Sequence, residues 1–126
     1  MGLDMYLEKR KTNSNEEPIE LVYWRKVNAV HKFFTKDYKR DNTTVIPVTK
    51  EKLEDLVNRC TEVLIKRTEE CSKELLPTTL GFFFGSISYD EEYYKGIEET
   101  KENIIRVLEN EYPLAQNEVI EYFAWY

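Results

Sequence analysis

The sequence predicts an α+β domain in which three helices pack on a small, mainly antiparallel sheet. Apolar residues alternate with a period of two near both ends of the chain, and they recur with a helical period between those ends. The length of 126 residues suits one domain, spanning 1–126. A hydrophobic content of 41% and an aromatic content of 13% can offset the entropy of ordering the chain.

Short alternating segments predict the strands. The first lies around residues 3–8, and a second at 19–23 follows a turn-rich stretch, so we expect the two to pair antiparallel. Residues 45–48 include Pro47, which cannot donate a ladder hydrogen bond, and therefore predict an edge strand. The tail, 119–126, predicts a final strand that is apolar on both faces, and this is the one hint of a homo-oligomer.

Three longer segments have the helical period. They cover about residues 24–37, 50–76 and 89–110. Thr49 is expected to cap the second helix, and Ser88 with Glu91 fits a capping box at the start of the third. The second helix is the longest and should be the scaffold of the domain.

Composition excludes several classes of protein. Cys60 and Cys71 lie eleven residues apart on the predicted second helix, too far for a disulfide, and are expected to be buried thiols. With one histidine in the chain, we expect no metal site and no cofactor. No apolar run approaches the ~18 residues of a membrane span, and residues 1–10 lack a signal-peptide pattern, so we expect a cytoplasmic protein without a membrane partner.

The net charge of −6 conceals an asymmetry. Residues 1–50 carry ten basic and seven acidic side chains, a net +3, whereas residues 51–126 carry eight and seventeen, a net −9. The segment 25–40 alone has a net charge of +5, which can attract a small anion. The acidic remainder argues against duplex DNA as a partner, because DNA binding depends on neutralised phosphates.

A first candidate ligand-binding cluster lies at the start of the first predicted helix. It consists of Trp24, Arg25, Lys26, Asn28 and His31. Together they offer a stacking surface, a guanidinium fork, a point charge and neutral hydrogen-bonding groups, which are the parts of a nucleotide or phosphate site. In the alternative interpretation the tryptophan packs, both cations are solvated, and the asparagine caps a neighbouring loop.

A second candidate cluster is the glycine-bounded aromatic segment 81–86 with the helix start that follows it. Its candidate ligand-binding residues are Phe82, Phe84, Ser86 and Tyr89. Unpaired amides at a helix start favour an anion, although acidic residues crowd this one. We therefore expect an aromatic wall with glycine hinges. In the alternative, the phenylalanines fill the core and the glycines permit a close backbone approach.

Catalytic motifs are absent from the sequence. It contains no GxxxxGK[ST], G-x-G-x-x-G, G-x-S-x-G or HExxH pattern. Nothing brings a nucleophile to His31, and the paired glutamates are typical of solvated helix faces. We therefore assign no catalytic residue and expect a protein that is not an enzyme.

Three blocks of the chain carry a resemblance. They are GLDMYL at 2–7, YWRKVNAVHKFF at 23–34 and LLPTTLGFFFGSISYDEEYY at 75–94. In this order they resemble a family of small proteins encoded by phages, prophages and other bacterial mobile elements. This chain departs from the family pattern at Phe33, where relatives usually have tryptophan, and in its C-terminal tail.

The resemblance implies an accessory protein that acts in an infected bacterial host, with host antiviral defence as the pathway. The first hypothesis is a protein that sequesters a nucleotide-type immune signal, a cyclic oligonucleotide or an ADP-ribose derivative, without catalysis. The second is an acidic inhibitor that binds a host defence protein such as a CRISPR effector. The third is a small hydrolase of the same signal, with His31 as general acid and base.

Overall fold

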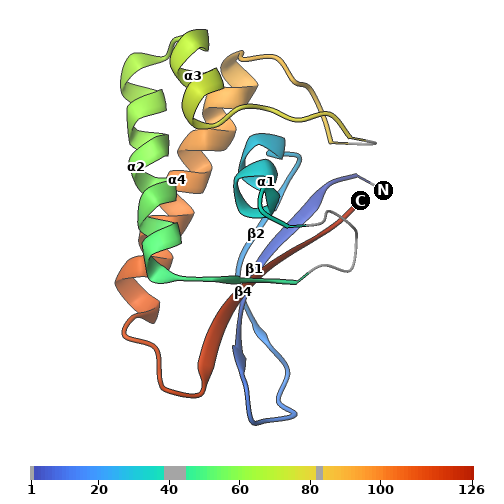
Figure 1. Ribbon diagram of the computed structural model, residues 1–126, viewed down its shortest axis with the longest axis vertical. Helices are drawn as coiled ribbons and strands as arrows, with labels where there is room; N and C mark the ends of the chain where they lie inside the picture. Colours follow the sequence, from blue (N-terminus) through green and yellow to red (C-terminus); the bar gives the residue numbers. More distant parts are fainter. Residues whose placement is uncertain (1, 39–44, 82–83) are drawn as a thin grey trace.

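The structure is a computed structural model that describes residues 2–38, 45–81 and 84–126. Within them the chain forms four helices and a four-stranded antiparallel sheet, which confirms the α+β prediction (Figure 1). In chain order the elements are β1 (Asp4–Lys11), β2 (Ile19–Arg25), α1 (Asn28–Thr35), β3 (Ile46–Val48), α2 (Lys50–Lys66), α3 (Glu69–Leu75), α4 (Glu91–Glu111) and β4 (Glu118–Trp125).

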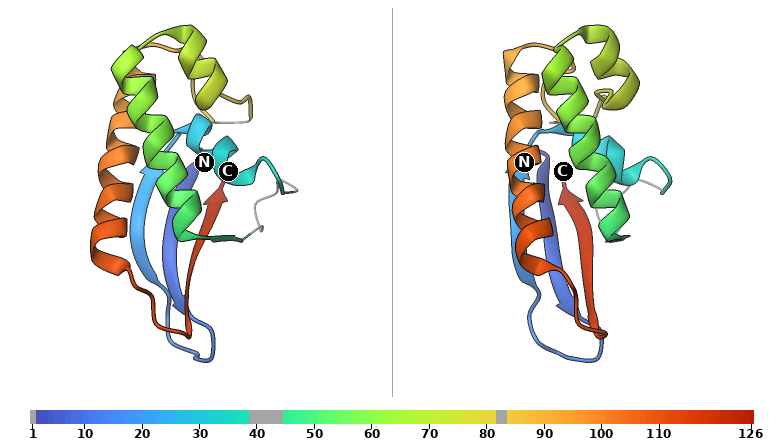
Figure 2. Two further views of the ribbon diagram at one scale, coloured as in Figure 1. Left: turned by 60° about the vertical axis from the view of Figure 1, so that its left-hand side comes forward. Right: turned by 90° about the vertical axis from the view of Figure 1, so that its left-hand side faces the viewer.

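The strands are ordered β2-β1-β4-β3. The antiparallel pairing of β1 with β2, the edge position of β3 and the strand in the C-terminal tail are all as predicted. Because β1 and β4 are antiparallel neighbours, Asp4 pairs with Trp125 and the two ends of the chain lie side by side (Figures 1 and 2). Residues far apart in the sequence therefore share the centre of the sheet.

The helices form a layer on one face of the sheet. Figure 2 shows α2 and α4 side by side against this face, and α1 joins them because the Phe34 ring stacks on the Tyr122 ring of β4, with centroids 4.5 Å apart. Side chains of β1 and β4 that point toward the helices are buried, whereas Tyr23 and Trp125 on the opposite face are 46% and 53% exposed. Among the described residues, this opposite face has no helix over it.

The first helix begins later than its period predicts. Trp24 belongs to β2, where it pairs with Met5, and Lys26 then adopts a φ of +57° that turns the chain toward α1. The prediction that Trp24 lies at the start of the first helix is therefore wrong, and Trp24, Asn28 and His31 are all buried. Cross-strand pairing with β1 overrides the local helical period.

The predicted second helix is two helices. Thr49 caps α2 as expected, accepting a hydrogen bond from the Lys52 amide at 3.1 Å. The helix then ends at Lys66, because the C-cap Arg67 has a φ of +48° that redirects the chain. Thr68 caps α3 by accepting a hydrogen bond from the Cys71 amide. Four helices therefore replace the three predicted.

The capping box predicted for the last helix is also wrong. The N-cap of α4 is Asp90, whose carboxylate accepts from the Tyr93 amide at 3.1 Å. Ser88 lies before the helix and donates its amide hydrogen to the Ser86 hydroxyl. A carboxylate two residues closer to the helix takes the capping position, and the predicted end near residue 110 agrees with the observed end at Glu111.

Both cysteines are free and buried, as predicted, although they lie on different helices. Burial raises the pKa of the Cys60 thiol to about 12. Across the described parts of the chain, no helix combines the length and apolar character needed to cross a membrane.

Candidate functional site

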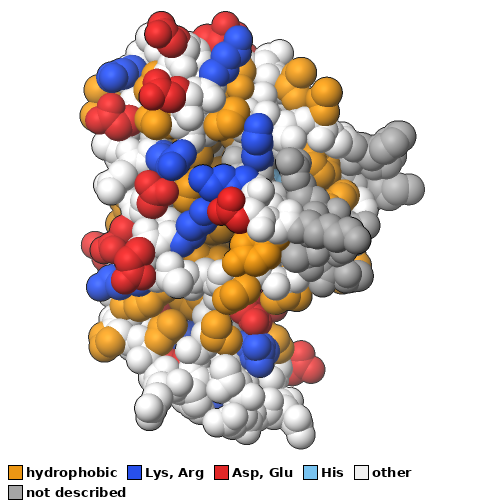
Figure 3. All heavy atoms as spheres, viewed as in Figure 1, with side chains coloured by type: hydrophobic (Ala, Val, Ile, Leu, Met, Phe, Trp, Pro, Cys, Tyr) orange, Lys and Arg blue, Asp and Glu red, His pale blue; other side chains and the backbone are white. Residues whose placement is uncertain are grey.

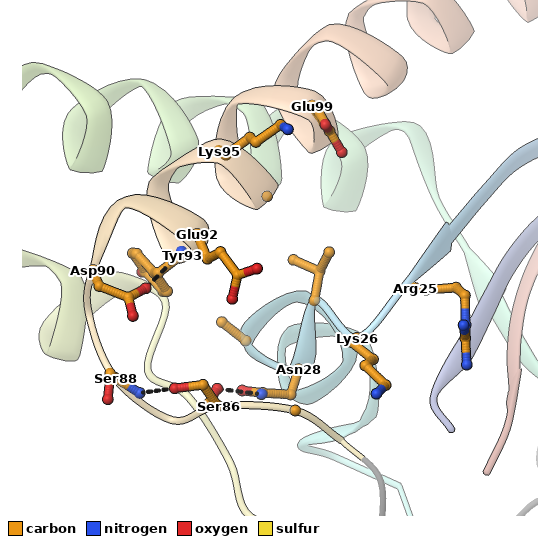
Figure 4. A pocket seen from close by; sticks show the side chains of 14 residues that line it. Arg25, Lys26, Asn28, Ser86, Ser88, Asp90, Glu92, Tyr93, Lys95 and Glu99 are labelled. Carbon is orange, nitrogen blue, oxygen red and sulfur yellow. Dashed lines mark hydrogen bonds between the residues drawn. The ribbon is translucent and has the colours of Figure 1, made fainter. Parts of the chain in front are cut away.

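A cavity of about 310 Å³ lies between the start of α1, the segment 85–88 and the first turns of α4 (Figure 4). It brings together parts of both predicted clusters, because Arg25, Lys26, Asn28 and Ser86 all line it. The other lining residues are Val27, Ala29, Gly85, Ser88, Asp90, Glu92, Tyr93, Lys95, Gly96 and Glu99. This volume is at the lower end of the range of ligand pockets, about 300–1,000 Å³.

Asn28 fixes one wall of the cavity. Its side-chain amide donates to the carbonyl oxygens of Phe84 at 3.2 Å and Ser86 at 3.0 Å, and its Oδ1 accepts from the Thr79 amide at 3.0 Å. The side chain is 3% exposed, so these bonds form away from solvent. Asn28 therefore holds two loop segments against α1, as in the loop-capping alternative considered for it, rather than offering its amide to a ligand.

Lys26 occupies a strained backbone position at the cavity. Its φ of +57° lies in the left-handed region, which costs a residue other than glycine about 1–2 kcal/mol of conformational free energy. Gly2 and Gly85 lie against its side chain, because a Cβ atom on either would come within 3.3 Å of Lys26 carbons. Backbone strain of this kind concentrates at functional sites, which makes Lys26 the residue of the cavity that most needs an explanation.

The lining carries charges of both signs. Arg25 is paired with Asp4 at 2.8 Å and points away from the other labelled side chains in Figure 4. Within the described ranges, Lys26, Lys95 and Glu92 form no ion pair. The cavity therefore offers both cationic and anionic groups, the former from segment 25–40 and from Lys95.

The predicted stacking groups do not line the cavity. Trp24 is 5% exposed, its ring lies edge-on to Tyr122, and its indole N–H has no acceptor among the residues that the structure describes. Phe84 is buried in the core, as in the core-filling alternative. Phe82 lies outside the described residues. The Tyr89 hydroxyl accepts from the Thr78 amide at 3.0 Å, and Tyr89 does not line the cavity either.

His31 lies in the core between α1 and the sheet. It is 2% exposed, and its Nδ1 is 2.7 Å from the Tyr122 hydroxyl. Its ring packs edge-on against Phe84 and Tyr126, with centroids 5.1 Å and 5.5 Å away. Burial raises the pKa of Tyr122 well above its ordinary value. Because His31 does not line the cavity, we do not carry the hydrolase hypothesis forward.

The residues that sequence reasoning missed come from α4. Glu92, Lys95 and Glu99 line the cavity together with Gly96, and their spacing of three and four places them on one helix face. Gly96 lets that face approach α1, since a Cβ atom there would be 3.3 Å from a methyl group of Val27. Gly96, lying among these polar residues, is the feature of the sequence that could have indicated a close contact. The sequence does not show which element this helix face contacts.

The basic segment 25–40 is divided by the fold. Figure 3 shows a group of basic side chains near the middle of one face of the molecule. Lys36 of this segment, together with Lys52 and Arg59 of α2, surrounds the Phe33 ring, and their charged groups lie 5.8, 4.2 and 5.4 Å from the ring centroid. Burial, and then the charge of Lys36, lower the pKa of Lys52. Arg25 and Lys26 line the cavity and Lys36 does not, so the net charge of the segment is not gathered at one site.

No protein-family model, curated protein or solved structure matches this chain. In the parts of the chain that the structure describes, no group of three or more His, Cys, Asp or Glu side chains could hold a metal ion.

Proposed function

We propose that this protein binds a small nucleotide-type molecule in the cavity between α1 and α4 and holds it without chemical change. The observation that carries the proposal is Lys26, a cation kept at the cavity in a backbone conformation that glycine would adopt with less strain. A lysine in a left-handed backbone conformation is explained if its ammonium group binds the ligand.

The separated charges of the lining suit the separated groups of a nucleotide. A phosphate would lie between the ammonium groups of Lys26 and Lys95, because charge-assisted hydrogen bonds to phosphate are the strong ones. The hydroxyl groups of a ribose would donate to Glu92 and Glu99, as acidic side chains accept from ribose in dinucleotide-binding folds. A purely basic pocket would lack these acceptors.

The size of the cavity limits which nucleotides it can hold. A volume of about 310 Å³ favours a mononucleotide, or the nucleotide part of an ADP-ribose derivative, over a cyclic oligonucleotide. Tyr93 supplies the aromatic surface at the cavity in place of the buried Trp24 and Phe84.

The biological setting of the proposal rests on the resemblance to phage and prophage proteins. A nucleotide-type immune signal held in this cavity would be withdrawn from the defence system of an infected bacterium. Binding alone is sufficient for this role, and a protein that sequesters its ligand should release it unchanged.

The proposal is tested by melting the protein with AMP, ADP-ribose and cyclic di-AMP at millimolar concentration. A ligand present at 100 times its Kd stabilises the folded state by about 2.7 kcal/mol, which corresponds to a rise in Tm of about 10 °C for a domain of this length. We expect this rise with AMP or ADP-ribose, and chromatography after heating should recover the intact nucleotide.

Two lysine variants make the test specific. Lys95→Ala removes a cation from the cavity and should abolish the rise in Tm, whereas Lys73→Ala removes an exposed cation from α3 and should leave it unchanged. Absence of any rise, or an equal rise in both variants, would refute binding in this cavity. Recovery of a cleaved nucleotide would refute the proposal that the ligand is unchanged.

A further inference from the structure

The face of the sheet opposite the helices is organised in rows that cross the strands. The register pairs Glu8 of β1 with Glu20 and Glu121, its neighbours on β2 and β4. Two residues earlier on β1, Tyr6 pairs with Tyr23 and Phe123 in the same way. Because side chains two residues apart on a strand share a face, a row of three carboxylates lies beside a row of three aromatic rings.

The aromatic row forms a continuous apolar surface. The Tyr6 ring stacks on Phe123 with centroids 4.8 Å apart and an interplanar angle of 11°, and it meets Tyr23 at 5.2 Å. Trp125, two residues beyond Phe123 on β4, is 53% exposed. A solvated sheet face ordinarily carries polar residues, so exposed aromatics gathered here indicate an interaction surface.

The carboxylate row is electrostatically unfavourable as it stands. Like charges directly opposite each other on neighbouring strands destabilise a sheet. Burial, followed by the charges of Glu20, Glu121 and Glu17, raises the pKa of Glu8. Arg10 neutralises Glu121 through two hydrogen bonds of 2.9 Å, which leaves an excess of negative charge around Glu8.

A hollow of about 540 Å³ lies where the two rows meet. Phe123, Trp125, Val45 and Pro18 supply its apolar lining, and Glu8, Glu121 and Arg10 supply the charged groups. Its walls thus combine aromatic faces with the carboxylate of Glu8, which forms no ion pair within the described residues.

We propose that this hollow binds a lysine or arginine side chain from a basic segment of a partner protein. The aliphatic stem of such a side chain packs on an aromatic surface while its charged head stays polar. Here the stem would lie against Phe123 and Trp125 and the cation would reach Glu8, gaining a cation–π interaction and a salt bridge together. The bound cation would also relieve the repulsion within the carboxylate row.

Charge selects this occupant over the alternatives. A second copy of the chain docking the same face would bring two carboxylate rows toward each other, and like-charge contacts disfavour such a pairing. A nucleic acid would meet the same repulsion from its phosphates. The surface lies on the side of the sheet away from the cavity of α1 and α4, so the inference stands independently of the proposed ligand.

The test titrates the whole protein with an acetylated hexa-arginine peptide at low salt and follows tryptophan fluorescence. Trp125 is exposed and Trp24 is buried, so a signal from this face disappears in Trp125→Phe. Glu8→Gln removes the charge from the hollow, and the matched control Glu102→Gln removes an exposed charge from α4. Glu8→Gln also removes like-charge repulsion, so we expect its Tm to equal or exceed that of the wild type.

We expect saturable binding that Glu8→Gln weakens at least about fivefold and that Glu102→Gln leaves within twofold, with no binding of hexaglutamate. No binding of hexa-arginine, or equal weakening by both variants, would overturn the proposal. A wild-type dimer in sedimentation equilibrium that Trp125→Ser dissociates would also overturn it, in favour of a second copy on this face.

Discussion

Removing the side chain of Asn28 tests whether this residue organises the cavity. In Asn28→Ala, the carbonyl oxygens of Phe84 and Ser86 lose their donor and the Thr79 amide loses an acceptor. All three bonds converge on a side chain that is 3% exposed, so water does not readily replace it. The substitution should therefore destabilise the fold and loosen one wall of the cavity.

The magnitude follows from the number of bonds. Each intramolecular hydrogen bond contributes about 0.5–1.5 kcal/mol net. Three bonds give a loss of about 2–4 kcal/mol in the free energy of unfolding, which is a large part of the stability of a small domain. Asn28→Asp keeps the acceptor for Thr79, but its carboxylate would face two carbonyl oxygens, so its destabilisation should be larger at pH 8 than at pH 4.

Urea denaturation followed by circular dichroism measures these differences. Asn103→Ala is the matched control, because it removes one exposed hydrogen bond from Arg106 on α4 and should change stability by less than about 0.5 kcal/mol. Hydrogen exchange should show faster exchange of the Thr79 amide in Asn28→Ala. A loss below 1 kcal/mol, or unchanged exchange at Thr79, would refute the assignment of Asn28 as the residue that holds the two segments.

Three further changes have defined outcomes. Lys26→Gly relieves the left-handed backbone and should hold or raise stability by up to about 1 kcal/mol in thermal melts while abolishing nucleotide binding; a clear loss of stability would show that the lysine is there for packing. Gly81→Ala places a Cβ atom 2.5 Å from the Phe84 ring and should lower the free energy of unfolding by about 1–3 kcal/mol in urea melts. An unchanged free energy of unfolding would show that the Phe84 ring can move aside. Burial raises the pKa of Cys60 from 9.0 to about 12, so the unfolded chain releases this proton first and stability should fall as pH rises above about 9; Cys60→Ala should reduce that slope between pH 9 and 10 in pH-dependent urea melts, and an unchanged slope would contradict the burial effect.

Much of the fold could be predicted because its signals are local. Alternation identified the first and last strands, and short apolar segments next to turn-rich stretches identified the other two. Pro47 marked β3 as an edge, and Thr49 marked the start of α2. The errors occurred where a tertiary contact or a single backbone angle overrides the local period. Trp24 continues β2 because β1 pairs with it, and the helical period around Arg67 does not reveal that its backbone is left-handed.

The candidate site was predicted in part. Arg25 and Lys26 do meet Ser86 at one cavity, although Ser86 comes from a distant segment of the chain. The stacking role assigned to Trp24 was misplaced, because residue type shows that a side chain can stack but not whether it faces solvent. The contribution of α4 was missed, since nothing in the sequence indicates that its polar stripe faces α1.

The sequence by itself determined the class of the fold, its strands, the start of α2 and the end of α4, because periodicity and capping act over a few residues. The tertiary structure decided which side chains meet. It buried Trp24 and His31, joined α1 to α4 around the cavity, and aligned Glu8 with Glu20 and Glu121 in one row. Strand register and helix packing join residues from opposite ends of the chain, and a local pattern contains no information about such pairings.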